Sequence, residues 1–466
     1  MKLYLTGLSL VIIISALYLS KVPDDKKEEN PPNIVFLFTD DHSVPDLGAY
    51  GNDKIHTPNI DRLAEEGVLF NRAYVTSSQC SPSRASILTG RYAHEVGASR
   101  LHVDRMTDFE SIISMLNDKG YYTGSLRKVH QKNIESEFDF SVGRRSTVFV
   151  DAFLDELPED TPFFIWFGTT DPHRPYTNDY EYKHDPNEIY VPDFLPDTGP
   201  VREDIANYYN EITRFDTESG EIMKLLEERG LADNTMIIMA GDNGMPFPRA
   251  KATLYEDGIQ VPLIIKWPGQ GQSGVVNDDL ISLIDLTPTW LELAGIEVPE
   301  EMRGQSLLPL LRSEDYEKRE YIFAGRNWHD NWDPMRSVVG ERYKLIQNYR
   351  PEVGITHTLD RLFSPTWDEF DRLKEEGDLG DERLEYFFAE SRPVVEFYDL
   401  ENDPGEWNNL ADDPEYADLI DEYQQALSDW MNETHDFLPS PKEAFPSKRL
   451  NNSYDVLDAE EFDSSN

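Results

Sequence analysis

The chain has 466 residues, of which 39% are hydrophobic, and it carries 89 Asp and Glu against 43 Lys and Arg, a formal net charge of −46. A chain of this length exceeds one ordinary hydrophobic core, so two domains are expected. The acidic excess excludes general nucleic-acid binding, which requires a basic surface. It suits either a protein that stays soluble in a saline medium or ordinary acidic solubility.

The first twenty residues have the pattern of a targeting segment. Lys2 precedes an apolar stretch from Leu3 to Ser20, which is typical of a secretory signal peptide. The stretch also reaches the length of an uncleaved membrane anchor. Residues 21–31 follow as a charged linker. Since the one cysteine, Cys80, cannot form an internal disulfide, we expect an exported periplasmic or secreted protein of bacterial type.

Apolar runs of strand length alternate with amphipathic helical patterns over about 300 residues. The predicted strands cover residues 33–39, 121–126, 162–168, 235–240 and 261–267, and helices are predicted at 59–66, 109–119 and 201–228. This alternation predicts an α/β fold with an open, mixed and mostly parallel sheet flanked by helices.

Polar side chains follow four of the predicted strands directly. In an open α/β sheet, ligands bind outside the carboxyl ends of the strands, so these side chains should meet at one edge. They are Asp40, Asp41 and His42 after the first strand, Lys128 and His130 after the second, Asp171 and His173 after the third, and Asp242 and Asn243 after the fourth, with Lys251 soon after.

Cys80 lies at the start of a predicted helix. Pro82 suits the first helical position and Gly90 suits the residue past the end. A side chain at such a helix start faces backbone N–H groups and the positive end of the helix dipole, where anions bind. An isolated cysteine is most often buried among apolar groups, but the flanking Ser81, Ser83 and Arg84 indicate a polar site.

Four of these residues form a candidate metal site. Asp40, Asp41, Asp242 and Asn243 offer only oxygen ligands, which suit a hard divalent cation, Ca²⁺ in preference to Mg²⁺. The cationic and proton-transferring groups are Arg84, Lys128, His130, His173 and Lys251. Together with a divalent cation, they predict a site that holds an anionic group.

The pattern changes after residue 320. Short strand-like pieces at 321–324, 336–339, 344–347 and 396–399, followed by a helical pattern at 416–433, predict a smaller α+β domain with an antiparallel sheet. The catalytic domain is therefore expected over residues 32–320 and the C-terminal subdomain over 321–440. An acidic, loosely held tail is expected over 441–466.

At this point the chain resembles a known family. The run Cys80-x-Pro82-Ser83-Arg84-x3-Leu88-Thr89-Gly90-Arg91 resembles the signature of the type I, formylglycine-dependent sulfatases, and the likeness extends from about residue 33 to 436. Further similar segments are Thr57 to Ala64 and Asp285 to Thr289. The segments Asp242 to Pro248, Pro334 to Val338 and Glu433 to Asp436 resemble the heparan N-sulfatase (sulfamidase) branch and its bacterial polysaccharide sulfatase relatives. The resemblance implies an alkaline-phosphatase-like fold.

The resemblance also implies a mechanism. A formylglycine-generating enzyme would oxidise Cys80 to Cα-formylglycine, whose hydrated aldehyde attacks sulfur with one hydroxyl and expels sulfate with the help of the other. By position, Asp40, Asp41, Asp242 and Asn243 would bind calcium, Arg84 would steady the hydrated aldehyde, Lys128 and His130 would assist the diol, and His173 and Lys251 would hold sulfate. Candidate sugar contacts are His102, Asp104, His329 and Arg336.

Two residues depart from the family pattern. Arg127 stands where the family usually has Gly, and Lys251 stands where the sulfamidase branch has Arg and O-sulfatases commonly have Lys. The leading hypothesis is an exported sulfatase that removes sulfate esters from a sulfated saccharide, such as the algal polysaccharide ulvan. The alternatives are an N-sulfoglucosamine sulfohydrolase acting on heparan fragments, a phosphodiesterase or phosphonate hydrolase of the same superfold, and an inactive carbohydrate-binding relative. No membrane partner is expected apart from an N-terminal anchor.

Overall fold

The computed structural model describes residues 31–103, 109–143, 147–177 and 180–438. The predicted targeting segment at 1–20, all but the last residue of the linker at 21–31, and the predicted tail at 441–466 lie outside these residues. The described residues group into one compact unit. The predicted domain boundary after residue 320 therefore stays a prediction. Among the described residues, no helix combines the length and the apolar character that a membrane crossing requires.

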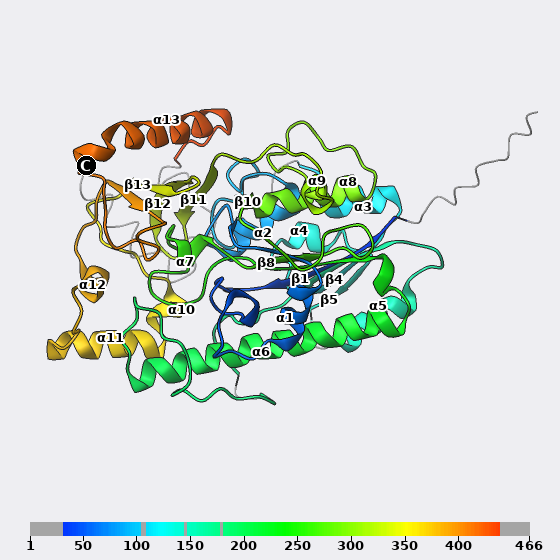
Figure 1. Ribbon diagram of the computed structural model, residues 1–466, viewed down its shortest axis with the longest axis horizontal. Coiled ribbons are helices and arrows are strands. Elements are labelled where there is room, and N and C mark those ends of the chain that lie inside the picture. The colour runs from blue at the N-terminus through cyan, green and yellow to red at the C-terminus, as the bar shows by residue number, and fades with distance from the viewer. Residues whose placement is uncertain (1–30, 104–108, 144–146, 178–179, 439–466) are drawn as a thin grey trace, which may run out of the picture. The chain divides into compact units, whose positions relative to one another are not determined.

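A mixed, mostly parallel sheet of eight strands forms the larger part of the fold, as predicted (Figure 1). Its central strand β1 pairs in parallel with β6 on one side and β7 on the other. On one flank β4 and β5 continue the parallel arrangement, and on the other flank β8 runs antiparallel to both β7 and β2. The strands, in sheet order, are β5 (Phe140–Val142), β4 (Tyr122–Arg127), β6 (Phe163–Gly168), β1 (Asn33–Thr39), β7 (Thr235–Gly241), β8 (Leu263–Lys266), β2 (Val68–Phe70) and β9 (Val275–Asn277).

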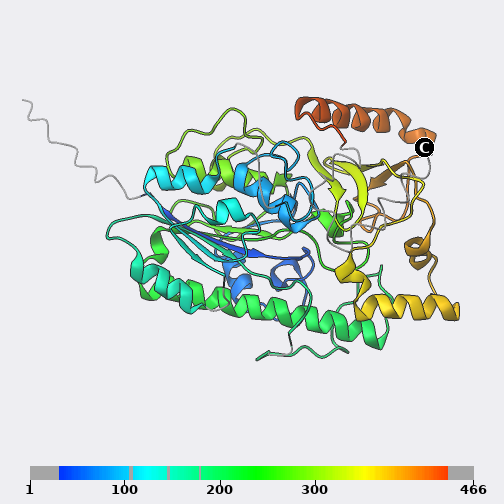
Figure 2. The same cartoon turned by 180° about the vertical axis from the view of Figure 1, so that it is seen from behind.

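Helices cover both faces of this sheet, which explains why its central strands are apolar throughout (Figures 1 and 2). Alternate residues of β1 point to opposite faces: Phe36 and Phe38 pack into one core, and Val35 and Leu37 pack into the other. The first core includes α2 (Cys80–Thr89), α3 (Ile112–Lys119) and α8 (Leu286–Leu293), and the second includes α1 (Pro58–Glu65), α5 (Val148–Glu156) and α6 (Gly199–Glu228).

Helix α2 begins at Cys80, two residues earlier than predicted, so Pro82 is its third residue rather than its first. Gln79 is the extended N-cap residue, and Gly90 ends the helix in the left-handed region with φ 65°, as the sequence predicted. All ten residues of α2 are buried. The helix therefore presents the Cys80 side chain to the interior at its positive end.

A second sheet of four antiparallel strands follows in the C-terminal part, in agreement with the predicted α+β region. Its strands are β11 (Ile322–Trp328), β12 (Trp332–Val339), β13 (Tyr343–Asn348) and β14 (Val395–Asp399). Helix α13 (Ala417–Glu433) shares a hydrophobic core with this sheet. The remaining helices and short strands of the described chain include β3 (Ala73–Tyr74), α4 (Lys132–Glu135), α7 (Glu256–Ile259), β10 (Ile281–Ser282), α9 (Leu308–Leu311), α10 (Leu359–Leu362), α11 (Pro365–Glu376) and α12 (Glu382–Glu385).

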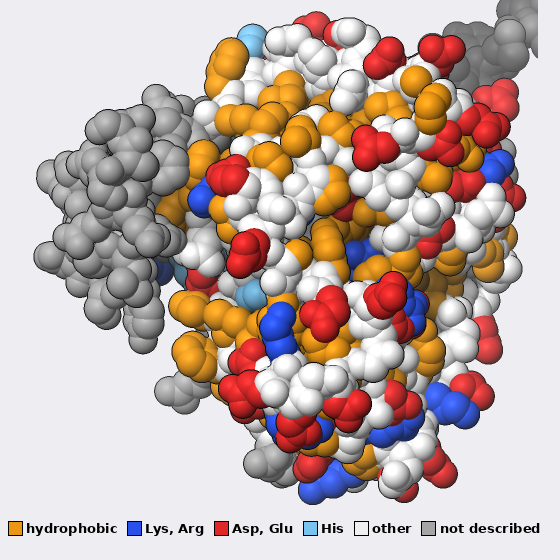
Figure 3. Space-filling model, turned by 90° about the vertical axis from the view of Figure 1, so that its left-hand side faces the viewer, with side chains coloured by type: hydrophobic (Ala, Val, Ile, Leu, Met, Phe, Trp, Pro, Cys, Tyr) orange, Lys and Arg blue, Asp and Glu red, His pale blue; other side chains and the backbone are white. Residues whose placement is uncertain are grey.

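On the face shown in Figure 3, acidic side chains are scattered among white and apolar areas, and no single acidic patch dominates it. This distribution agrees with a general solubility role for the negative charge.

Candidate active site

The ends of β1 and β7 bring four oxygen-bearing side chains together at one edge of the large sheet. Asp40, Asp41, Asp242 and Asn243 have no exposed surface. The backbone N–H of Asp41 donates to Asp242 Oδ1 at 3.0 Å, and Asn243 Nδ2 donates to Asp41 Oδ1 at 2.8 Å. The structure thus assembles all four predicted metal ligands, and it does so because β1 and β7 are neighbours in register.

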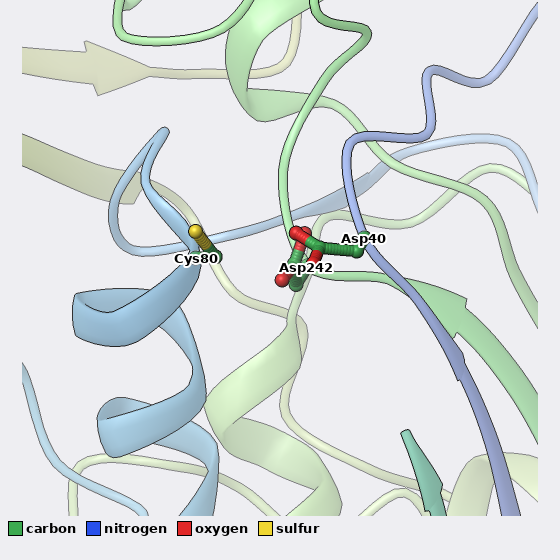
Figure 4. Close-up of side chains that lie close together, drawn as sticks. All are labelled: Asp40, Cys80 and Asp242. Carbon is green, nitrogen blue, oxygen red and sulfur yellow. The ribbon is translucent and has the colours of Figure 1, made fainter. Parts of the chain in front are cut away.

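Cys80 faces this cluster from the first turn of α2 (Figure 4). Its Sγ and one carboxylate oxygen each of Asp40 and Asp242 lie within 4.8 Å of one another. Burial raises the pKa of the Cys80 thiol to about 12, although Lys128 opposes that shift. The unmodified thiol is therefore a poor nucleophile at neutral pH.

Two buried oxygens of the cluster have no partner among the described residues. They are Asp40 Oδ1 and Asn243 Oδ1. A buried polar atom without a partner carries a desolvation cost, and such atoms often mark a missing ion or water. Since both atoms are oxygens of types that Ca²⁺ and Mg²⁺ prefer, the residues present fit a hard divalent cation.

Basic side chains surround the carboxylates. Arg84 is fully buried, and its Nε donates to Asp242 Oδ2 at 2.7 Å while its Nη1 donates to the backbone oxygen of Lys128 at 2.7 Å. The Lys128 ammonium pairs with Asp40 Oδ2. Lys251 Nζ donates to Asp41 Oδ2 at 2.8 Å, and His173 Nε2 lies 3.7 Å from the same oxygen. Four of the five residues expected here thus lie against a carboxylate of the metal candidates.

The two central carboxylates have opposite pKa shifts. Burial raises the pKa of Asp242 to about 7, and the neighbouring Asp40 carboxylate adds to this effect. Burial also favours the neutral form of Asp40, but Lys128 and His173 hold its pKa well below the usual range. The environment therefore pushes apart the pKa values of two adjacent carboxylates, a pattern that is common at functional sites.

A pair of histidines lies beside Lys128. His130 Nε2 is 3.1 Å from His102 Nδ1, and the backbone N–H of His102 donates to Ser81 Oγ at 2.9 Å. Burial and the charge of Lys128 lower the pKa of His130 to about 2, so its imidazole is neutral. Its Nδ1 is buried without a partner among the described residues. His102, predicted to contact sugar, thus also contacts a predicted catalytic residue.

An open pocket of about 460 Å³ adjoins this pair of histidines. Lys128 and His130 line it and also belong to the predicted site, so the pocket borders that site. Arg127 also contributes to its wall, but this side chain donates to Thr169 Oγ1 at 2.9 Å and pairs with Glu218 at 2.7 Å. The other lining residues are His102, Val129, Lys132 and Glu135.

The remaining candidate sugar contacts differ in outcome. Arg336 is 1% exposed and all five of its N–H groups donate within the protein, two of them to Asp436, so the prediction that it contacts sugar is not supported. His329 is buried, and its Nδ1 lies 2.9 Å from Asp330 Oδ2 in the turn between β11 and β12. Its role stays a prediction. Asp104 lies outside the described residues.

Two residues outside the predicted set of site residues join the loop after β4 to the start of α2. Gln131 is fully buried and its Nε2 donates to the backbone oxygen of Ser81 at 3.1 Å, while Ser81 Oγ accepts from His102. Both contacts tie the loop after β4 to the turn that carries Cys80. Their position in the sequence could have indicated them, because Gln131 directly follows His130 and Ser81 directly follows Cys80.

Comparison with known proteins agrees with this geometry. The sulfatase family model matches residues 32–296, and the model of the C-terminal region of N-sulphoglucosamine sulphohydrolase matches residues 249–366. The chain is 31% identical to an ulvan-active sulfatase of Formosa agariphila, with 91% of this chain and 78% of the relative covered. It is also 31% identical to the N-sulphoglucosamine sulphohydrolase of Homo sapiens, with 87% and 91% covered.

A solved structure of a protein in complex with its substrate D-glucosamine-2-N,6-O-disulfate has the same fold. The two superpose with a TM-score of 0.69 at 21% identity, over 89% of this chain and 100% of that one. The match places the eight-stranded sheet and the C-terminal sheet in one alkaline-phosphatase-like architecture. From the family-model match and the identity to full-length relatives, the chain belongs to the sulfatase family.

Proposed function

We propose that this sulfatase releases sulfate from a sulfated saccharide, with the Cα-formylglycine formed from Cys80 as its nucleophile. The observation that carries the proposal is the position of Cys80 within 4.8 Å of the Asp40 and Asp242 carboxylates. The raised pKa of its thiol makes Cys80 itself a poor nucleophile, which supports oxidation to the aldehyde by a formylglycine-generating enzyme. The hydrated aldehyde carries two hydroxyls, one to attack sulfur and one to expel sulfate afterwards.

Asp40, Asp41, Asp242 and Asn243 are proposed to hold Ca²⁺. The bound cation would supply positive charge that favours ionisation of a nearby hydroxyl and stabilises charge on sulfate oxygens. The oxygens Asp40 Oδ1 and Asn243 Oδ1, which accept no hydrogen bond from the part of the chain that the structure describes, support this assignment.

The remaining site residues suit proton transfer and anion binding. Arg84, fixed between Asp242 and the backbone of Lys128, would steady the hydrated aldehyde. His130, whose Nδ1 has no partner among the described residues, would accept the hydroxyl proton when the aldehyde re-forms and the sulfate ester bond to residue 80 breaks. Lys251 and His173, which meet at Asp41 Oδ2, would hold sulfate, and one of them would protonate the leaving sugar oxygen.

For the substrate, we propose an O-sulfated saccharide such as ulvan oligosaccharides. The relative named as ulvan-active supports this assignment, as does Lys251, the residue that O-sulfatases commonly carry at this position. Activity as an N-sulfoglucosamine sulfohydrolase is the second candidate, because the C-terminal model of that enzyme matches residues 249–366. The apolar segment at 3–20 supports export from the cell.

The chemistry can be tested by mass spectrometry of the peptide that contains residue 80 and by sulfate release. Protein co-expressed with the converting enzyme should contain the aldehyde and release sulfate, whereas the matched Cys80→Ala variant should release none. An unmodified thiol in a preparation that cleaves sulfate esters at the full rate would falsify the proposed nucleophile.

The substrate is tested separately with a panel of sulfated oligosaccharides from ulvan, carrageenan, fucoidan and heparin. We expect the highest kcat/KM on an ulvan oligosaccharide. A preference for N-sulfated heparin fragments would instead establish the second candidate. Hydrolysis of a phosphodiester or a phosphonate ester, measured by release of its alcohol, at a higher rate than sulfate release would contradict both.

A further inference from the structure

The loop that carries Lys251 contains a residue in a disfavoured conformation. Ala252 has φ 63°, in the left-handed region that a β-carbon disfavours. Such a conformation persists only where the surrounding structure fixes it, and it is common next to functional groups. The adjacent Lys251 donates from Nζ to Asp41 Oδ2, in the centre of the site. Because Ala252 directly follows Lys251, its backbone conformation affects the position of the Lys251 side chain.

Two hydrogen bonds hold the backbone of Ala252 from opposite sides. Its N–H donates to the backbone oxygen of Ser78 at 2.9 Å, two residues before Cys80. Its carbonyl oxygen accepts from Arg326 Nη1 at 2.6 Å. The first contact joins the Lys251 loop to the turn that carries the nucleophile. The second joins it to β11, a strand of the C-terminal sheet.

Arg326 donates hydrogen bonds from both terminal nitrogens, while its Nε has no partner among the described residues. The side chain is buried, its Nη1 lies 3.2 Å from Asp333 Oδ2, and its Nη2 donates to Thr356 Oγ1 at 2.8 Å. The same Asp333 oxygen accepts from Thr356 Oγ1 at 2.7 Å. The guanidinium thus reaches three segments of the chain, which the single ammonium of a lysine could not do with the same planar geometry.

We propose that Arg326 is a positioning residue for the reaction, although it contacts no residue assigned to the chemistry. From the C-terminal sheet it fixes Ala252 in the left-handed conformation, and this keeps Lys251 Nζ on Asp41. The inference rests on the proposed function in one respect, namely that Lys251 holds sulfate there.

The neighbouring Arg392 provides a matched control. It is also buried and pairs with both oxygens of Asp333, one of them at 3.2 Å. None of its hydrogen bonds given by the structure reaches Ala252. If Arg326 served only to neutralise Asp333, the two arginines would be equivalent.

The first test compares Arg326→Lys with Arg392→Lys in the full-length protein, with residue 80 converted and the same sulfated substrate. We expect Arg326→Lys to lower kcat roughly 10–100-fold, the range seen when a group that orients an active-site residue is lost. KM should change less than kcat. Arg392→Lys should lower the melting temperature to a similar degree but leave kcat nearly unchanged. Equal losses of kcat in the two variants would overturn the proposal.

The second test asks whether Arg326 acts through Lys251. In a Lys251→Met background, Arg326→Lys should have little further effect on the residual kcat, because residues that act as a unit are not additive. Full additivity of the two losses would contradict the proposal. If Arg326→Lys does not fold, Thr356→Val removes one support of the guanidinium, and it should show the same dependence on Lys251 with a smaller loss.

A crystal structure of Arg326→Lys gives a readout that does not depend on activity. Ala252 should leave the left-handed region, and Lys251 Nζ should move away from Asp41 Oδ2. Retention of the wild-type contact at 2.8 Å would overturn the positioning role. If the wild-type protein released no sulfate from any substrate, the proposed function would fail, while this structure would still decide the role of Arg326.

Discussion

At the edge of the large sheet, Asp40 and Asn243 each keep one buried oxygen without a partner among the described residues, whereas in the C-terminal sheet both oxygens of Asp333 are satisfied. Asp333 accepts from Arg326, Arg392 and Thr356. Both clusters bury acidic and basic groups together. Among the described residues, the unpartnered atoms of the first cluster are oxygens that a cation could bind, whereas those of the second, Arg326 Nε and Arg392 Nε, are donors that a cation could not use.

The pKa values of the carboxylates also differ between the two clusters. Burial raises the pKa of Asp242 to about 7 despite the nearby Arg84. Burial also acts on Asp333, but Arg326 and Arg392 outweigh it and keep its pKa below the usual range. In the C-terminal sheet the Asp333 carboxylate is therefore stabilised as an anion by its own arginines. At the edge of the large sheet, Asp242 is a carboxylate that a further cation would stabilise.

We expect the largest effect from a substitution of Asp40 in the first cluster. Asp40→Asn should lower kcat/KM roughly 10⁴-fold, equivalent to about 5 kcal/mol, because the variant loses both a metal-ligand charge and the partner of Lys128. Calcium added to chelator-treated wild-type protein should raise its melting temperature, and this increase should be absent in the variant. A calcium response of the same size in both proteins would show that the unpartnered oxygens do not mark the cation site.

A substitution in the Asp333 cluster should instead lower the stability of the folded protein. Asp333→Asn leaves Arg326 and Arg392 buried without their anion, so we expect the free energy of unfolding to fall by about 3–4 kcal/mol. Urea unfolding measures it. The calcium-induced increase in melting temperature should persist, because Asp333 is not among the proposed ligands. Loss of that increase would mean that the two clusters are not independent.

The same contrast explains how much the sequence could predict. Asp40 and Asp242 were predicted together because each directly follows a continuous apolar strand, and parallel neighbours deliver such residues to one edge. The strand at 33–39 was predicted with its observed bounds for the same reason. The strands β5 and β9 were missed, because three half-exposed residues carry no periodicity.

Contacts between the two sheets could not be predicted. Arg326 meets Ala252 only through the way the C-terminal sheet packs, and 74 residues separate the two in sequence. For Arg336, in contrast, the sequence suggested a ligand contact that the structure does not support. An arginine within a recognisable motif looks the same in sequence whether it binds a ligand or, as here, pairs with Asp436 across 100 residues.

Asp216 adds a third case to these two clusters, because it is a buried carboxylate that accepts hydrogen bonds from neutral donors. It accepts from the backbone N–H groups of Asn59 and Ile60 at 2.9 and 2.7 Å, and burial raises its pKa to about 6. The folded state therefore keeps this proton above pH 3.8, where the unfolded state has lost it, so its contribution to stability falls as pH rises toward 6.

The difference in unfolding free energy between wild type and Asp216→Asn isolates this effect. Between pH 5 and pH 7 the wild type should lose about 1 kcal/mol relative to the variant. Urea unfolding at the two pH values measures the change. A constant difference would show that hydrogen bonds from neutral donors suffice to keep a buried carboxylate at its ordinary pKa.

The smallest effect is expected where charge is exposed. Lys224 and Glu228 form an i,i+4 pair at 3.4 Å on α6, and their side chains are 72% and 61% exposed. Water screens such a pair and its ordering costs side-chain entropy, so Lys224→Ala should lower the free energy of unfolding by at most about 0.5 kcal/mol. Removing one of many surface charges should leave both the calcium response and kcat unchanged. A loss near that of Asp333→Asn would mean that burial is not what separates the strong charge pairs of this protein from the weak ones.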